Sequence, residues 1–149
     1  MNNMRAVPAM TRCAPSPEEQ AFLEDRLYEF NRDQVGQDDG RVFAFFLRNE
    51  QQEIVAGISG WTWARACEIR QLWVHPSLRG HGHGRALLDS AEAEARARGC
   101  TVILLSTYDF QAPALYRKCG FELGWQLNDF PPGHQYCCML KRLGDTGAP

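Results

Sequence analysis

The sequence lacks several features that would assign a protein class on their own. No run approaches the roughly 18 consecutive apolar residues needed to span a bilayer, and the N-terminus shows no long apolar segment of a signal peptide. Neither sign of charge dominates: the 149 residues carry a formal net charge of −2, which gives no electrostatic case for nucleic acid. We therefore expect a cytoplasmic protein that binds neither membranes nor nucleic acid.

Metal-binding and disulfide signatures are missing as well, although the chain has six cysteines. No Cys-x-x-Cys pair occurs, and no spacing of cysteine and histidine matches a zinc site. His75, His81 and His83 lie on an irregular segment without a carboxylate at a characteristic spacing, so we expect no metal there. Most cysteines fall inside apolar patterns and are expected to be buried or semi-buried thiols in a reducing compartment. They are Cys13, Cys67, Cys100, Cys119, Cys137 and Cys138.

What is present fits one globular domain. Apolar residues make up 44% of the chain and charged residues 23%, an ordinary balance for a folded protein. A chain of this length buries a sizeable core without a metal or a disulfide. No repeat or low-complexity linker interrupts it. We expect a single domain over residues 1–149, with irregular ends at 1–15 and 143–149.

Three segments carry helix signals. Ser16 is a predicted N-cap, Pro17 stands at the first helical position, and Glu19 completes a capping box. The clearest helix spans 84–98, because its apolar residues recur at helical spacing and a glycine follows as a stop. A short helix is predicted over 112–118. The expected buried stripe of the clearest helix is Leu87, Leu88, Ala91 and Ala95.

Strand signals occupy most of the remaining sequence. Segments rich in aromatic and β-branched residues, or short continuous apolar runs, predict strands at 41–48, 54–64, 67–74, 101–106, 121–125 and 136–140. The resulting order is helix, three strands, helix, strand, helix, two strands. This order predicts an α/β fold with a mixed sheet and helices on its faces.

The segment LRGHGHGRALL at 78–88 places three glycines between a strand and a helix. The first N–H groups of a helix have no internal partner and carry the positive end of its dipole. Glycines remove side chains that would keep a phosphate away, and Arg79 and Arg85 add positive charge. The segment therefore predicts a pyrophosphate cradle, with a plain glycine-rich turn as the alternative.

Other phosphate-binding motifs fit this segment less well. A Walker A loop ends in Gly-Lys-Ser/Thr, whereas the chain has Gly84-Arg85-Ala86. A Rossmann fingerprint belongs in the first βα turn of a parallel sheet, but here three strands that look hairpin-connected come first. A kinase-like phosphate binder is disfavoured for the first of these reasons.

Two motifs together resemble the GCN5-related N-acetyltransferases (GNAT). Arg79-Gly80-His81-Gly82-His83-Gly84 is similar to the family's Arg/Gln-x-x-Gly-x-Gly/Ala acyl-coenzyme A loop. Residues 112–121 resemble its second signature, Ala-x-x-x-Tyr-x-x-x-Gly-Phe, and residues 72–76 look like the strand before the loop. The resemblance runs over about residues 40–142, with 17–31 as the usual first helix. It implies a mostly antiparallel sheet containing a splayed parallel strand pair, with helices on both faces.

The resemblance implies acetyl coenzyme A as cosubstrate. In this family the pyrophosphate binds the loop, and the pantetheine arm lies where two parallel strands separate, which here are 67–74 and 101–106. Backbone groups of Trp73 and Val74 would hydrogen-bond the pantetheine amides, as an added strand does. The residues expected to bind the cofactor are Trp73, Val74, Arg79, Gly80, His81, Gly82, His83, Gly84 and Arg85.

Two residues are candidates for the acid–base chemistry. Tyr116 matches the family tyrosine near the sulfur of coenzyme A, and a phenol with an ordinary pKa near 10 is protonated at neutral pH; a core tyrosine is the alternative. Glu68 is the candidate base, since strict alternation puts it on the strand face of Leu72 and Val74. A solvated glutamate with a water chain as base is the alternative, and Asp109 is a weaker candidate.

The chain departs from the family at Asp109, where asparagine is common seven residues before the tyrosine. We predict that Asp109 caps the short helix instead. Trp61 and Trp63 share one strand face, and form either core or a wall of the acceptor pocket. Residues 128–134 border either that pocket or a dimer contact.

The sequence therefore favours an acyltransferase that moves the acetyl group of acetyl coenzyme A to a primary amine of a small molecule or peptide, by direct transfer in a ternary complex. The alternative is a non-catalytic acyl-coenzyme A sensor or partner module of the same fold. Fold kinship does not specify the acceptor. Family members are often dimers, so a homodimer is compatible with the chain.

Overall fold

The computed structural model describes residues 8–144, which divide into two units between Gly36 and Gln37. Residues 8–15 and 143–144 form no helix or strand, and the rest of the ends expected to be irregular, 1–7 and 145–149, lies outside the described residues. No helix within the described range is long and apolar enough to cross a membrane. All six cysteines are free thiols.

Within its described residues, 8–36, the first unit contains one helix, α1 (Pro17–Val35). The Ser16 hydroxyl accepts a hydrogen bond from the Glu19 N–H at 3.2 Å, and the Glu19 carboxylate accepts one from the Ser16 N–H at 2.8 Å. This reciprocal pair satisfies two N–H groups at the helix start. The predicted capping box is therefore confirmed, and the helix extends further than predicted at its C-terminal end.

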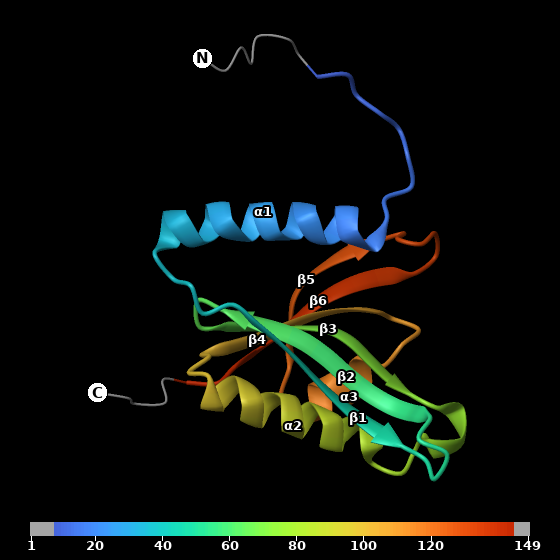
Figure 1. Cartoon of the computed structure of the whole chain (residues 1–149). Helices are drawn as coiled ribbons and strands as arrows, with labels where there is room; N and C mark the ends of the chain where they lie inside the picture. The colour runs from blue at the N-terminus through green and yellow to red at the C-terminus, as the bar shows by residue number, and fades with distance from the viewer. Residues whose placement is uncertain (1–7, 145–149) are drawn as a thin grey trace. The chain divides into compact units, whose positions relative to one another are not determined.

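The second unit is built on a six-stranded sheet with the order β1-β2-β3-β4-β6-β5 (Figure 1). Among the described residues the β3–β4 pair is parallel and the other pairs are antiparallel, which confirms the mixed sheet with one parallel pair. Each strand coincides with a predicted one, with shifts at the ends. The strands are β1 (Arg41–Arg48), β2 (Ile54–Trp63), β3 (Ala66–Val74), β4 (Val102–Tyr108), β5 (Glu122–Asn128) and β6 (Gln135–Arg142).

A β-bulge interrupts β3. Gln71 pairs with Ser59 of β2, but Ile69 already pairs with Gly60, so Arg70 is an extra residue without a partner across the ladder. An extra residue bends a strand and breaks the strict alternation of its side chains between the two faces.

The bulge overturns the prediction that Glu68 shares a strand face with Leu72 and Val74. Leu72 pairs with Ile58, which is buried, whereas Glu68 pairs with Trp61, whose side chain is on the opposite face of β2. Because the extra residue lies between them, counting by twos from Val74 assigns Glu68 to the wrong face. Glu68 lies on the sheet face opposite the core.

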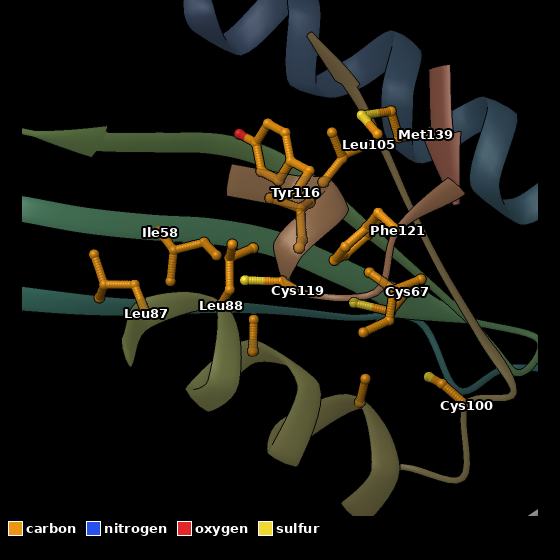
Figure 2. Close-up of a cluster of buried hydrophobic side chains, with 14 of the residues drawn as sticks. Ile58, Cys67, Leu87, Leu88, Cys100, Leu105, Tyr116, Cys119, Phe121 and Met139 are labelled. Carbon is orange, nitrogen blue, oxygen red and sulfur yellow. The ribbon is translucent and has the colours of Figure 1, made fainter. Parts of the chain in front are cut away.

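Two helices pack on the core face of the sheet, α2 (His83–Ala97) and α3 (Pro113–Lys118). α2 packs against β1, β2 and β3, and α3 contributes Tyr116 to the core. Figure 2 shows side chains of both helices gathered with those of the strands. A short 3-10 helix, η1 (Pro76–Leu78), follows β3 and was not predicted. The buried residues of α2 are the four predicted, Leu87, Leu88, Ala91 and Ala95.

Candidate active site

The two parallel strands separate part-way along their length. Pairing of β3 with β4 begins at Ala66–Val102 and stops at Ile69–Leu105, although both strands continue beyond this point. Beyond this point β3 and β4 do not pair with each other, so backbone groups facing the gap that have no other partner can bind a ligand that adds itself as a strand. The splayed pair implied by the family resemblance is therefore present.

A cavity of about 780 Å³ occupies this gap and reaches the glycine loop and α3. Every residue expected to bind the cofactor lines this cavity except His81, and Tyr116 lines it as well. Glu68 lies outside it. Sequence reasoning missed Gln71, Ser106, Gln111 and other lining residues; a signal for Ser106 was available, since it is the first polar residue after a continuous apolar run.

The N-terminus of α2 faces this cavity without a side-chain cap from any described residue. Gly82 is its N-cap with a φ of +86°, in the left-handed region that favours glycine. The Ala86 N–H donates to the Gly82 carbonyl at 3.0 Å, so the N–H groups of the three residues between them have no acceptor within the helix. These N–H groups and the helix dipole form an anion-binding position.

Gly84 has a different role from Gly82. A Cβ at Gly84 would lie 3.1 Å from Cδ2 of Leu115, which is tighter than an ordinary contact, whereas a Cβ at Gly82 would meet no described atom within 4 Å. Gly84 therefore lets α2 approach α3, and Gly82 sets the backbone turn that starts α2.

Basic side chains flank the loop. The Arg79 Nε donates to the Val74 carbonyl at 3.0 Å, so this carbonyl, one of the groups expected to bind pantetheine, already has a partner within the chain. Arg85 is 63% exposed, with its Nε 4.0 Å from Asp89 Oδ2. Its guanidinium is therefore accessible to an anion. His81 is placed beside Leu78, with Nδ1 3.4 Å from the Leu78 carbonyl oxygen.

Tyr116 combines a packed ring with access to the cavity. Its side chain is 8% exposed, and its ring meets Phe121 edge-on with centroids 5.9 Å apart. Figure 2 shows the hydroxyl directed away from the aliphatic side chains. Burial, with a smaller effect of Cys119, raises the pKa of Tyr116 above its ordinary value of 10. The phenol therefore holds its proton at neutral pH.

Glu68 is held in place by its neighbours on the opposite face. The Trp61 indole N–H donates to the Glu68 carboxylate at 2.7 Å, and Arg70 Nε lies 3.8 Å from the same carboxylate. The Arg70 guanidinium also lies over the Trp61 ring, 5.3 Å from its centroid. Trp61 and Trp63 share this face, as predicted, with nearly parallel rings 6.3 Å apart. The Glu68 side chain is 43% exposed, so it is accessible to solvent or to an acceptor.

The prediction that Asp109 caps α3 is wrong. Ala112 is the N-cap and makes no side-chain capping bond with any described residue, because Asp109 comes too early in the chain to reach the first turn. Asp109 Oδ1 instead lies 3.1 Å from His134 Nδ1. The turn before α3 is closed by the Gln111 side chain, which accepts from the Tyr108 N–H at 2.9 Å.

Known proteins resemble this chain in sequence and in fold. The acetyltransferase (GNAT) family model matches residues 6–121. Blasticidin-S acetyltransferase of Streptomyces morookaense is 36% identical over 106 residues, which cover 68% of this chain and 76% of that protein. An acetyltransferase of Agrobacterium fabrum is 29% identical over 126 residues, covering 85% and 92%. The crystal structure of an acetyltransferase from Bacillus cereus matches with a TM-score of 0.74 at 28% identity, covering 90% of this chain and 98% of that one.

Proposed function

Because this chain belongs to the GNAT acetyltransferase family and is an acyltransferase, we propose that it transfers the acetyl group of acetyl coenzyme A to a primary amine, directly and within a ternary complex in the cytoplasm. The observation that carries this proposal is the cavity, which runs from the N-terminus of α2 along β3 to Tyr116. One continuous cavity thus joins an anion-binding position, a free strand edge and a proton donor.

The residues divide the binding of coenzyme A between them. The N–H groups at the start of α2, with Arg79 and Arg85, hold the pyrophosphate. The edge of β3 beyond Ile69, where pairing with β4 has stopped, holds the pantetheine amides. Positioning of both substrates at the gap then supplies much of the rate.

The chemical step has a proton donor and a candidate acceptor. The amine nitrogen attacks the thioester carbonyl, the carbon–sulfur bond breaks, and the departing thiolate takes the proton of Tyr116. Glu68, directly or through water, accepts the proton released by the amine. On β3 it lies next to Ile69, the last residue paired with β4, and so at the closed end of the gap.

Transfer through an acyl-enzyme is disfavoured because, among the described residues, no cysteine lines the cavity. Burial raises the pKa of Cys119, and burial followed by the charge of Glu68 raises the pKa of Cys138, which pairs with Ser106 across β4 and β6. A thiol held in its protonated form is a poor nucleophile. The blasticidin-S acetyltransferase relative favours a small molecule rather than a peptide as the acceptor.

Calorimetry and a thiol assay test this function. We expect purified protein to bind acetyl coenzyme A and to release free coenzyme A when amines from a broad panel are added. Absence of acetyl coenzyme A binding would reject the proposal. Tight binding without turnover on any amine would identify the chain as an acyl-coenzyme A sensor of the same fold.

A further inference from the structure

We infer that the acceptor amine carries a flat aromatic or heteroaromatic ring, which binds on a group of aromatic side chains at the end of β4 and on the β5–β6 hairpin. This inference rests on the proposed function and specifies its acceptor. We call the group the aromatic shelf; its members are Tyr108, Phe110, Trp125, Phe130 and Tyr136.

The rings of the shelf contact one another in a continuous chain. Tyr108 and Phe110 are stacked, with centroids 5.1 Å apart and planes within 4° of parallel. Tyr136 packs against Tyr108 at 4.9 Å, and Phe130 and Trp125 meet Tyr136 at 5.7 and 6.0 Å. Phe110 of the parallel pair is more than half exposed, so another flat ring can reach it in the offset or edge-on geometry that aromatic groups prefer.

Three members of the shelf stay exposed although they have aromatic neighbours. Phe110 is 57% exposed, Trp125 53% and Phe130 48%. Aromatic side chains of a core bury most of their surface, and a contiguous exposed apolar patch marks a binding surface. The shelf is therefore organised for contact without being covered by the residues that form it.

The shelf adjoins the proposed transfer point. Phe110 and Ser106 line the same cavity as Tyr116. Along β4, Ser106 and Tyr108 alternate onto the sheet face of Glu68, which pairs with Leu104. Two residues of strand span roughly 7 Å, so a ring on Tyr108 or Phe110 leaves its amine within a few bonds of the gap. Because the shelf and the cavity share Phe110, a small amine with a ring can lie on the shelf and place its nitrogen at the gap.

A polar pair holds the two sides of the shelf together. Asp109, next to Phe110, lies 3.1 Å from His134, which ends the turn after Phe130. The His134 ring stands edge-on to Phe110 with centroids 4.9 Å apart, and the Asp109 N–H donates to the Gln135 carbonyl at 3.0 Å. Asp109 is thus a positioning residue that ties the end of β4 to the β5–β6 hairpin.

Matched amines test the shelf. The probes are phenylalkylamines with spacers of one to five methylenes, each paired with its cyclohexyl counterpart, which has similar apolar bulk but no flat ring. We expect the phenyl member to show a KM roughly two- to tenfold lower, the size of an aromatic pair contact beyond area burial. Phe130→Leu and Trp125→Leu should bring the ratio of cyclohexyl to phenyl KM toward one, while acetyl coenzyme A affinity measured by calorimetry holds.

Phe46→Leu is the control, because Phe46 is 49% exposed on β1, outside the shelf, and should keep the ratio. Equal KM values for each pair, or a ratio that survives both shelf substitutions, would overturn the inference and leave acetyl transfer standing. If no amine releases coenzyme A, the proposed function fails instead. Saturation-transfer NMR with 4-phenylbutylamine then decides the shelf separately: a signal reduced by Phe130→Leu supports it, and no signal overturns it.

Discussion

The Tyr116 hydroxyl donates the proton to the departing thiolate in the proposed reaction. Tyr116→Phe removes that hydroxyl and keeps the ring that packs against Phe121. We expect kcat to fall by about 10²- to 10⁴-fold, the usual contribution of a positioned acid, while calorimetric affinity for acetyl coenzyme A and the thermal unfolding midpoint hold. Since burial raises the pKa of Tyr116 above 10, deprotonation of this group should lower kcat only above pH 10. Unchanged kcat in the variant would remove Tyr116 from the mechanism.

Glu68 is the residue whose role depends most on the bulge. In the parent protein the Trp61 indole N–H donates to the Glu68 carboxylate at 2.7 Å. Glu68→Gln keeps an oxygen that accepts this hydrogen bond, but the amide cannot take up a proton at neutral pH. We expect kcat to fall by about 10²-fold or more with little change in unfolding midpoint. A kcat at neutral pH equal to that of the parent would assign the base to water.

At the scale of the element, the glycine loop works through its backbone conformation. Gly82→Val forces a β-branched residue to a φ of +86°, at a cost of about 1–2 kcal/mol, and turns the first N–H groups of α2 away from their anion. We expect at least about a tenfold weaker acetyl coenzyme A affinity by calorimetry.

Gly36→Val is the matched control for the loop. Gly36 has a φ of +74° and, like Gly82, would place its Cβ within 4 Å of no described atom, but it follows α1. It should lower the unfolding midpoint without changing acetyl coenzyme A affinity. Equal loss of affinity in both variants would mean that strain, and not phosphate binding, explains the effect at Gly82.

Individual elements differ in how well the sequence predicts them. Local signals such as the Ser16–Glu19 box and the apolar stripe of the second helix depend on neighbours along the chain, and both were correct. The bulge at Arg70 was not predictable, because an extra residue is defined only by its pairing with β2. The Asp109–His134 contact joins residues 25 positions apart, so no local sequence pattern predicts it.

At the scale of the whole second unit, side-chain contacts of α2 and its C-cap Arg98 reach β1 and β2 on one side of the sheet and β6 on the other. The Arg98 guanidinium donates to the Arg41 carbonyl at 2.9 Å and to the Thr62 hydroxyl at 3.1 Å, and lies over the Phe43 ring. At the other side Glu92 of α2 accepts from Lys141 of β6. Because these contacts join distant parts of the chain, they contribute to the free energy of unfolding of the whole second unit.

Glu92 makes that stability depend on pH. Burial raises the pKa of Glu92, but hydrogen bonds from Lys141 and Arg96 outweigh burial and lower it below the ordinary 4.5. A lowered folded-state pKa gives stability that is present above about pH 4.5 and lost as the pH falls through the folded value. Glu92→Gln should therefore cost about 1–3 kcal/mol at pH 7, and the difference should shrink below pH 4.5 in denaturant titrations. The exposed Glu29, paired with Arg26, supplies the control Glu29→Gln, which should change stability little. A Glu92→Gln difference that stays constant from pH 7 to 3 would show that packing, and not charge, joins α2 to β6.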